Sequence, residues 1–191
     1  EDTLRLDNVP REQWERDEEI QAGRLSSRES ELILDAEKAL AILSDDGTAV
    51  ALPEAILQMR EDMQQVATRL AQSKVSEVTQ AIEQDIVAAL EEIIAALEKA
   101  QADLEEQQQQ QQQHQQGQPA DPPLVDRLAE LKMIRALQMR VNRRTVRFSE
   151  MVEGEQAFEP DLLKALEELS ARELRIYRVL RDIVVGRAEG S

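Results

Sequence analysis

Few residues of this chain have the type and spacing needed for catalysis or metal binding. His114 is the only histidine and lies in a glutamine tract without a second metal ligand, so we do not assign it a metal site. Ser73 and Lys74 could form a nucleophile and its base, but neighbouring residues of a helix point about 100° apart. The sequence also lacks Glu-x-x-His pairs, Gly-rich phosphate loops and a Gly-x-Ser-x-Gly turn. We therefore predict no catalytic, cofactor-binding or metal-binding residues and no enzymatic activity.

Basic residues cluster at Arg140, Arg143, Arg144 and Arg147. Contact with phosphate or nucleic acid is one interpretation, but no aromatic platform for bases accompanies the cluster. The formal net charge of −16 also argues against nucleic acid and anionic membranes as partners. Because residues 1–118 carry 26 acidic and 10 basic residues, we expect the arginines to pair with acidic residues of the long helix that precedes them.

The composition predicts an all-α protein with a thin core. Aromatic residues make up only 2% of the chain, glycines number six, and β-rich runs are absent. Leu, Ile, Val, Ala and Met must then fill the core of an elongated helical assembly. No apolar run reaches the roughly 18 residues of a membrane-spanning helix, so we expect no direct membrane span.

The central prediction is one very long, coiled-coil-like helix over residues 53–113. Residues 53–106 contain no Gly, and no Pro after the first position, which predicts an uninterrupted helix about 80 Å long. Residues 86–99 repeat a heptad whose apolar positions form a face wide enough for contact with two helices. Near Lys74–Thr79 the apolar spacing changes as in a stutter. This indicates a hinge or partner site or, as we prefer, local repacking where a third helix ends.

Residues 1–47 are predicted to form an N-terminal helical segment. Gly23 is expected to interrupt a first helix, and Ser26 or Ser27 to cap a second one. The connection over residues 48–52 is unusually apolar, and Pro53 disfavours helical geometry at Leu52. We expect Val50 and Leu52 to cover the end of the local helix pair, and the alternative is an exposed partner site.

Three further segments complete a chain that we expect to form one domain. Residues 107–123 form a Gln-rich tip and loop, residues 122–152 a return helix, and residues 160–186 a C-terminal helix. The acidic first half and the basic residues 119–152 suit an antiparallel helical hairpin or bundle with flanking charge pairs. Two arrangements fit: a hairpin whose return arm is broken at Gly154, or a last helix that turns back to form a compact bundle at one end.

Three stretches resemble an uncharacterised family of bacterial helical proteins. They are residues 46–55 (DGTAVALPEA), 80–92 (QAIEQDIVAALEE) and 131–142 (LKMIRALQMRVN). Members of that family carry an export signal and are encoded beside proton-channel components of the Tol/Exb type. The resemblance implies a periplasmic or other envelope location, and components of an energy-transducing membrane complex as partners. A cytoplasmic location is the alternative, and the resemblance carries over no site residues.

These features favour a helical scaffold or adaptor that acts through protein–protein contacts and forms homo-oligomers. The candidate partner contacts are Val50, Leu52, Ile86, Ile93, Leu97, Leu104, Arg140 and Arg144. The alternative is a chaperone-like holdase that grips clients near the Gln-rich tip. Exposed Leu97, Leu104 or Val125 would favour the holdase, and a continuous buried seam would favour the scaffold. Weak nucleic-acid binding through residues 140–147 is a third hypothesis.

Overall fold

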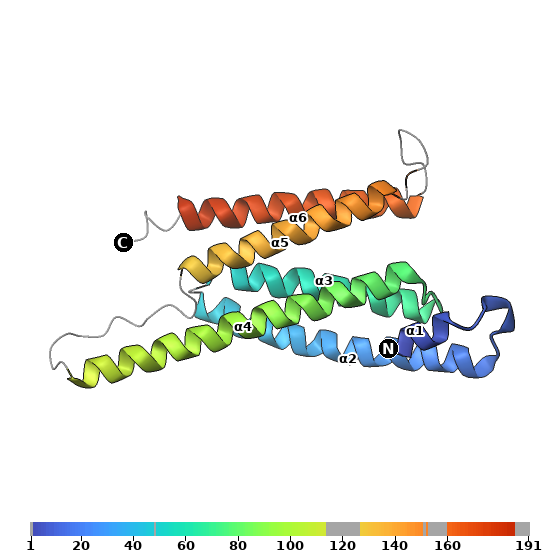
Figure 1. Ribbon diagram of the computed structural model, residues 1–191, viewed down its shortest axis with the longest axis horizontal. Helices are drawn as coiled ribbons and strands as arrows, with labels where there is room; N and C mark the ends of the chain where they lie inside the picture. The colour runs from blue at the N-terminus through green and yellow to red at the C-terminus, as the bar shows by residue number, and fades with distance from the viewer. Residues whose placement is uncertain (1, 48, 114–126, 151, 153–159, 186–191) are drawn as a thin grey trace. The chain divides into compact units, whose positions relative to one another are not determined.

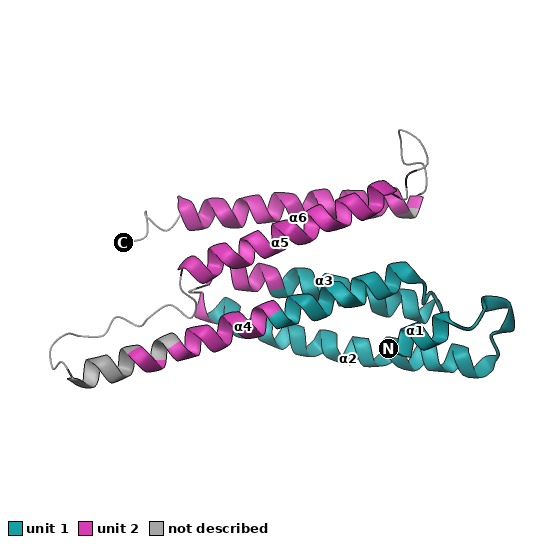
Figure 2. Cartoon of the chain, viewed as in Figure 1, with its two compact units in different colours: residues 1–45, 56–91 teal, residues 46–55, 92–191 magenta. Residues whose placement is uncertain are grey.

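The computed structural model describes residues 2–47, 49–113, 127–150, 152 and 160–185. Within these residues all regular structure is helical, with six α-helices, one 3₁₀ helix and no strand (Figure 1). The predicted all-α class is confirmed. The chain divides into two compact units, residues 1–45 with 56–91 and residues 46–55 with 92–191 (Figure 2). The single domain expected from the sequence stays a prediction, because compact units need not fold independently.

The first unit combines two short helical segments with most of two long helices and the N-terminal part of a third. The short segments are α1 (Asp2–Asp7) and the 3₁₀ helix η1 (Arg11–Gln13). The long helices are α2 (Arg16–Asp46), α3 (Ala51–Ala71) and α4 (Glu77–Gln113). The first turn of α3 and the part of α4 from residue 92 onward belong to the second unit.

Polar contacts made by side chains of α2 show how the helices of the first unit pack. The Ser26 hydroxyl donates to the Ala67 carbonyl at 2.8 Å, and Glu37 pairs with Arg60 at 3.5 Å. As residue numbers rise along α2 they fall along α3, so the two helices are antiparallel. Aliphatic side chains of all three long helices fill the space between them, among them Ile33, Leu43, Met59, Met63, Val66, Ile82 and Ile86, which are all buried.

Helix α2 runs without interruption through Gly23, so the predicted break at this glycine is wrong. Ser26 and Ser27 lie inside the helix and cap nothing; the Ser27 hydroxyl donates to the Gly23 carbonyl one turn earlier at 3.0 Å. A glycine inside a helix costs about 1 kcal/mol relative to alanine. Burial of Ala22 and of the apolar residues farther along α2 offsets that cost.

The predicted uninterrupted helix over residues 53–106 is wrong, because the chain turns between α3 and α4 at residues 72–76. Ser73 adopts a left-handed backbone conformation with φ of 57°. The Ser73 N–H donates to the Leu70 carbonyl and the Lys74 N–H to the Arg69 carbonyl, both at 2.8 Å. This is the Schellman pattern that ends a helix, here with serine at the position where glycine is usual.

Buried side-chain hydrogen bonds hold this turn in place. The hydroxyl of Thr79, which is fully buried, donates to the Lys74 carbonyl at 2.7 Å and accepts from Arg69 Nε at 2.8 Å. Gln80 Nε2 donates to the Val75 carbonyl at 3.0 Å. The spacing change at Lys74–Thr79 therefore marks a helix–helix corner and not a repacked stretch of one long helix.

The second unit contains a hairpin of two antiparallel helices, α5 (Arg127–Glu150) and α6 (Pro160–Val184). Gln138 Nε2 donates to Glu173 Oε2 at 2.7 Å, and Arg127 Nη2 donates to the Ile183 carbonyl at 3.0 Å. Between the two arrangements left open by the sequence, the structure has the one in which the last helix turns back. The predicted Gln-rich loop falls mostly on residues 114–126, outside the described residues.

Candidate interaction surface

The apolar connection between α2 and α3 is packed against the chain. Ala49 and Leu52 are buried and Val50 is half-buried, as expected if they cover a helix end. Helix α3 begins at Ala51, so the predicted non-helical geometry at Leu52 is wrong. Pro53 lies in the first turn, where its missing N–H removes no helical hydrogen bond. The alternative of an exposed partner site at this connection is contradicted by the burial.

A buried glutamate of α5 caps the N-terminus of α3. Glu130 Oε1 accepts hydrogen bonds from the backbone N–H groups of Val50 and Ala51, the second at 3.3 Å. A helix leaves its first N–H groups without internal partners, and its dipole favours negative charge there. Glu54, in the first turn of α3, accepts from Arg175 Nε of α6 at 2.9 Å. Both helices of the hairpin therefore hold the start of α3.

Two predicted partner contacts, Arg140 and Arg144, are buried. Arg140 Nη2 pairs with Glu92 Oε2 of α4 at 2.7 Å, which confirms for this arginine the expected pairing with an acidic residue of the preceding helix. Its Nε and Nη1 have no hydrogen-bond partner among the described residues. Within the cluster only Arg143 is exposed, and Arg147 is half-buried. The cluster is therefore not an exposed surface for phosphates.

The wide apolar stripe predicted on residues 86–104 is only partly buried. Ile86 and Ile93 are buried, so these two predicted partner contacts serve the core. Four neighbouring side chains of α4 are between 37% and 54% exposed; we call them the α4 ridge: Val87, Leu90, Ile94 and Leu97. Within the described part of one chain the stripe is therefore not fully covered, and its contact with two helices stays a prediction. The side chain of Leu104 lies outside the described residues.

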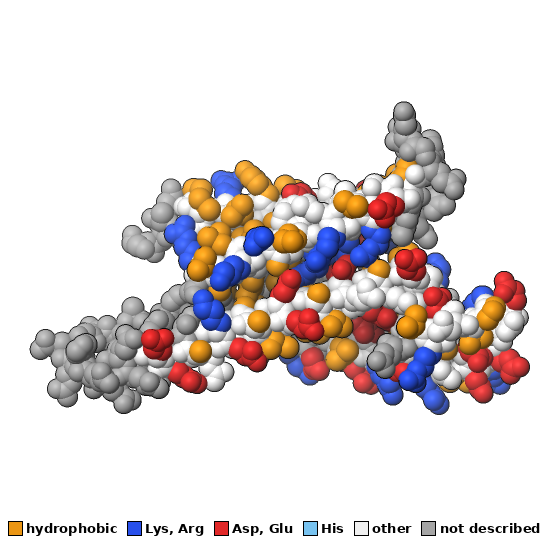
Figure 3. Space-filling model, viewed as in Figure 1, with side chains coloured by type: hydrophobic (Ala, Val, Ile, Leu, Met, Phe, Trp, Pro, Cys, Tyr) orange, Lys and Arg blue, Asp and Glu red, His pale blue; other side chains and the backbone are white. Residues whose placement is uncertain are grey.

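A second exposed apolar surface lies on the α5–α6 hairpin and was not predicted from the sequence. Its side chains are between 44% and 61% exposed. We call it the hairpin face: Leu128, Met139 and Val146 on α5, and Leu163, Leu174, Tyr177 and Val184 on α6. Figure 3 shows hydrophobic side chains together with Arg and Lys side chains over these two helices.

The exposed apolar residues of α5 form one stripe and those of α6 form another, and both stripes lie on the same side of the hairpin. Gln138 and Glu173, which join the helices, directly precede the face residues Met139 and Leu174. One residue is a rotation of about 100° along a helix. Because α5 and α6 are antiparallel, this equal rotation brings both stripes to one side. The opposite side carries buried residues such as Leu137.

A partly buried carboxylate of the first unit has an unusual protonation equilibrium. Burial, and next the negative charge of Glu83 on α4, raises the pKa of Glu29 from 4.5 to about 7. Glu29 Oε1 has no hydrogen-bond partner among the described residues. Glu83 accepts a hydrogen bond from the Thr3 hydroxyl of α1 at 2.6 Å. The charge on Glu29 therefore opposes the packing of α2 against α4.

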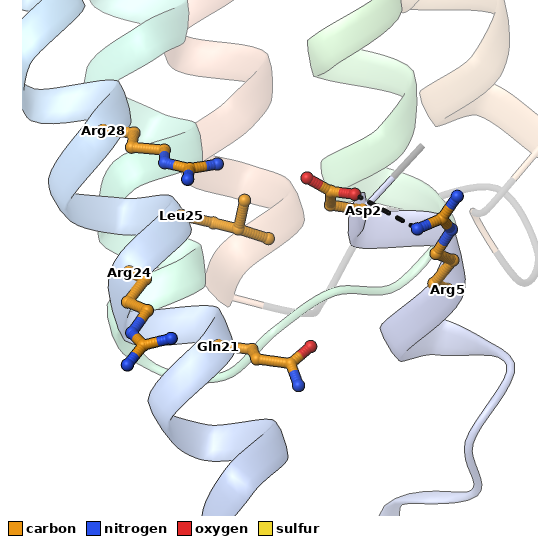
Figure 4. Close-up of a pocket in the computed structure, with 6 residues that line it drawn as sticks. All are labelled: Asp2, Arg5, Gln21, Arg24, Leu25 and Arg28. Atoms are coloured by element: carbon orange, nitrogen blue, oxygen red, sulfur yellow. Dashed lines mark ion pairs between the residues drawn. The ribbon is translucent and has the colours of Figure 1, made fainter.

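A shallow hollow lies between α1 and α2 and has a volume of about 230 Å³ (Figure 4). Five of its six lining residues are polar or charged: Asp2, Arg5, Gln21, Arg24 and Arg28, with Leu25. Arg5 pairs with Asp2 at 3.9 Å, and both side chains are largely exposed. Small-molecule sites are usually mostly apolar cavities of about 300–1,000 Å³, so this hollow does not define one.

Other kinds of site find little support in the described part of the chain. None of its helices is long and apolar enough to cross a bilayer. Nor do its His, Cys, Asp and Glu residues form a group of three that could hold a metal ion. Comparison with protein-family models, curated proteins and solved structures finds no match for the chain. The function must therefore be argued from the two exposed apolar surfaces.

Proposed function

We propose that this protein is a helical scaffold or adaptor that acts through protein–protein contacts. The hairpin face carries the proposal, because it gathers large apolar side chains of two adjacent helices on one side. Single exposed apolar residues are ordinary, whereas larger groups of them bordered by polar residues mark docking sites. Tyr177, the only tyrosine of the chain, lies within the face, and tyrosine is enriched at protein interfaces.

The hairpin is held firmly enough to present such a face. Glu130 and Arg175 tie α5 and α6 to the first turn of α3. Arg140 ties α5 to Glu92 of α4. A surface whose supporting helices are already ordered loses less conformational entropy when it binds, and this favours affinity.

The proposal is tested by affinity purification with matched surface variants. The Leu174→Ser/Tyr177→Ser variant removes two side chains of the hairpin face. The control Leu34→Ser/Ile42→Ser variant removes two exposed apolar side chains of α2. Partner proteins identified by mass spectrometry should be lost from the first variant and retained by the control. Equal recovery from both variants, or recovery of neither a second copy nor another protein with the unaltered chain, would contradict the proposal.

A chaperone-like holdase is the second candidate, and the exposure of Leu97 favours it. The α4 ridge leaves the predicted seam open, as clients of a holdase require. A holdase keeps a heat-unfolded client enzyme from aggregating near equimolar ratio, which light scattering measures. Suppression by the unaltered chain that is lost on Ile94→Ser/Leu97→Ser substitution would replace the scaffold proposal with the holdase.

The envelope location and the energy-transducing complex are also part of the proposal. They are supported by the resemblance of residues 46–55, 80–92 and 131–142 to an exported bacterial family. Fractionation of the native cells tests the location with an antibody to the chain. Recovery with the periplasmic or membrane-associated proteins is expected, and recovery with cytoplasmic markers would contradict this part of the proposal.

A further inference from the structure

We propose that the hairpin face of one copy binds the α4 ridge of a second copy. The inference deepens the scaffold proposal, on which it rests, by naming the partner of the hairpin face. Three observations support it: both surfaces are apolar and exposed, their charges are opposite, and their shapes correspond to a helix and to a pair of helices.

The α4 ridge has the spacing of a helix that packs lengthwise against others. Its residues follow one another at intervals of three, four and three, which are the core positions of a heptad. The hairpin face offers two antiparallel helices whose apolar stripes lie on one side. A single apolar ridge that lies along two neighbouring helices is the helix-in-groove mode of recognition.

The charges of the two surfaces are complementary. Helix α4 carries nine acidic residues and one basic residue, whereas α5 and α6 together carry twelve basic and seven acidic residues, with Arg140 and Arg144 buried. Glu91 and Glu98 each follow a ridge residue directly and are exposed. The exposed charges among the apolar stripes of the hairpin face are mainly basic: Lys132, Arg135, Arg143, Arg178 and Arg181, with Glu150 and Glu167.

Each surface matches the other better than it matches itself. Two ridges packed together would bring Glu91 and Glu98 to the seam without basic partners. Two hairpin faces packed together would bring their basic residues close to one another. Opposite potentials select partners by penalising such like-charge contacts. Because the two surfaces differ, the contact is heterologous, and each added copy leaves one surface of each kind to bind a further copy unless a ring closes.

Complementary variants test this pairing by sedimentation velocity over a hundred-fold concentration range. The ridge variant Ile94→Ser/Leu97→Ser keeps the hairpin face, and the face variant Leu174→Ser/Tyr177→Ser keeps the ridge. All four side chains are exposed, so both variants should retain the circular dichroism spectrum of the unaltered chain. The average mass of the unaltered chain should rise with concentration. Each variant alone should sediment as one chain, and an equimolar mixture should form a species of two chains.

Every other pattern contradicts the inference in a specific way. A face variant that still dimerises indicates ridge-to-ridge contact, and a ridge variant that still dimerises indicates face-to-face contact. An unaltered chain that stays at the mass of one chain, or a mixture that does not pair, removes the second copy as partner. If the affinity purification nevertheless yields another protein through the hairpin face, the scaffold function stands and only this inference fails.

A charge variant provides a test that does not depend on apolar substitutions. The Glu91→Lys/Glu98→Lys variant should associate with itself at least tenfold more weakly than the unaltered chain does at low salt. Added salt should reduce this difference. The control Asp17→Lys/Glu31→Lys makes the same change of charge on exposed positions of α2. Equal weakening by both variants would show that net charge, and not the ridge, controls association.

Discussion

Replacing Glu29 with glutamine should stabilise the protein at alkaline pH and have a smaller effect at acidic pH. The unfolded chain ionises Glu29 above pH 4.5, whereas the folded chain keeps the proton until the pKa of about 7. Because the pKa is raised in the folded chain, the contribution of Glu29 to the free energy of unfolding is greatest below about pH 4.5. That contribution then falls as the pH rises through about 7. Glutamine has the shape of the protonated acid and stays neutral, so the variant escapes this loss.

The size of the effect follows from the pKa of Glu29. A rise from 4.5 to about 7 corresponds to about 3.4 kcal/mol between the two charge states. Because Glu29 is partly exposed, solvent screening reduces this to about 1–2 kcal/mol of stability above pH 8. Near pH 5.5 less than half of that difference remains, because the folded carboxyl is still mostly protonated.

The assay is urea unfolding followed by circular dichroism, with unaltered and variant chains compared at several pH values. The range should start near pH 5.5, because the chain is least soluble close to its pI of about 4.5. The control Glu31→Gln changes an exposed glutamate of the same helix and should give no difference that grows with pH. A Glu29→Gln effect that is constant with pH, or that shrinks as the pH rises, would refute the reasoning.

Three substitutions test other parts of the fold by the same unfolding measurement. Gly23→Ala should stabilise by about 0.5–1 kcal/mol, because a Cβ there meets nothing within 4 Å; a loss of stability would show a contact that the structure lacks. Thr79→Val should destabilise by about 1–3 kcal/mol, because it leaves the Lys74 carbonyl and Arg69 Nε without this partner; a neutral outcome would show that the corner does not depend on the hydroxyl. Glu130→Gln should cost about 1 kcal/mol, because the amide oxygen still accepts a hydrogen bond but carries no charge; an unchanged stability would contradict its capping of α3.

The helices with conventional end signals could be located from the sequence. Pro160 and the leucine spacing after it predict a helix over 160–186, and α6 spans Pro160–Val184. Likewise Gly47, at a positive φ of 63°, follows the end of α2 as predicted. Local chemistry sets these boundaries, so local sequence reports them.

The corner between α3 and α4 could not be located in this way. It has no Gly or Pro, and Ser73 takes the left-handed position that glycine usually holds. The conformation depends on hydrogen bonds from Arg69 and Thr79, which lie on different helices. At Gly23 the error was the opposite, because the tertiary packing of α2 outweighed a local helix breaker.

The buried charged residues that hold α5 against α3 and α4 could have been found by following the faces of each helix. Glu130, Arg140 and Arg144 share the buried face of α5 with Leu137 and Val141, at intervals of three, four and seven. A charged residue in such a row indicates a buried partner. By contrast, both Ile86 and Val87 begin apolar columns on α4, and only the position of the neighbouring helices decides which column is covered.

Photocrosslinking from position 177 tests the central claim that this protein works through the hairpin face. A benzophenone amino acid replaces Tyr177 in the native cells, and a control variant carries it in place of Glu31, an exposed polar residue of α2. Discrete crosslinked products, to a second copy or to another protein, should form from position 177 and not from position 31. The same products from both positions, or none from position 177, would contradict the claim.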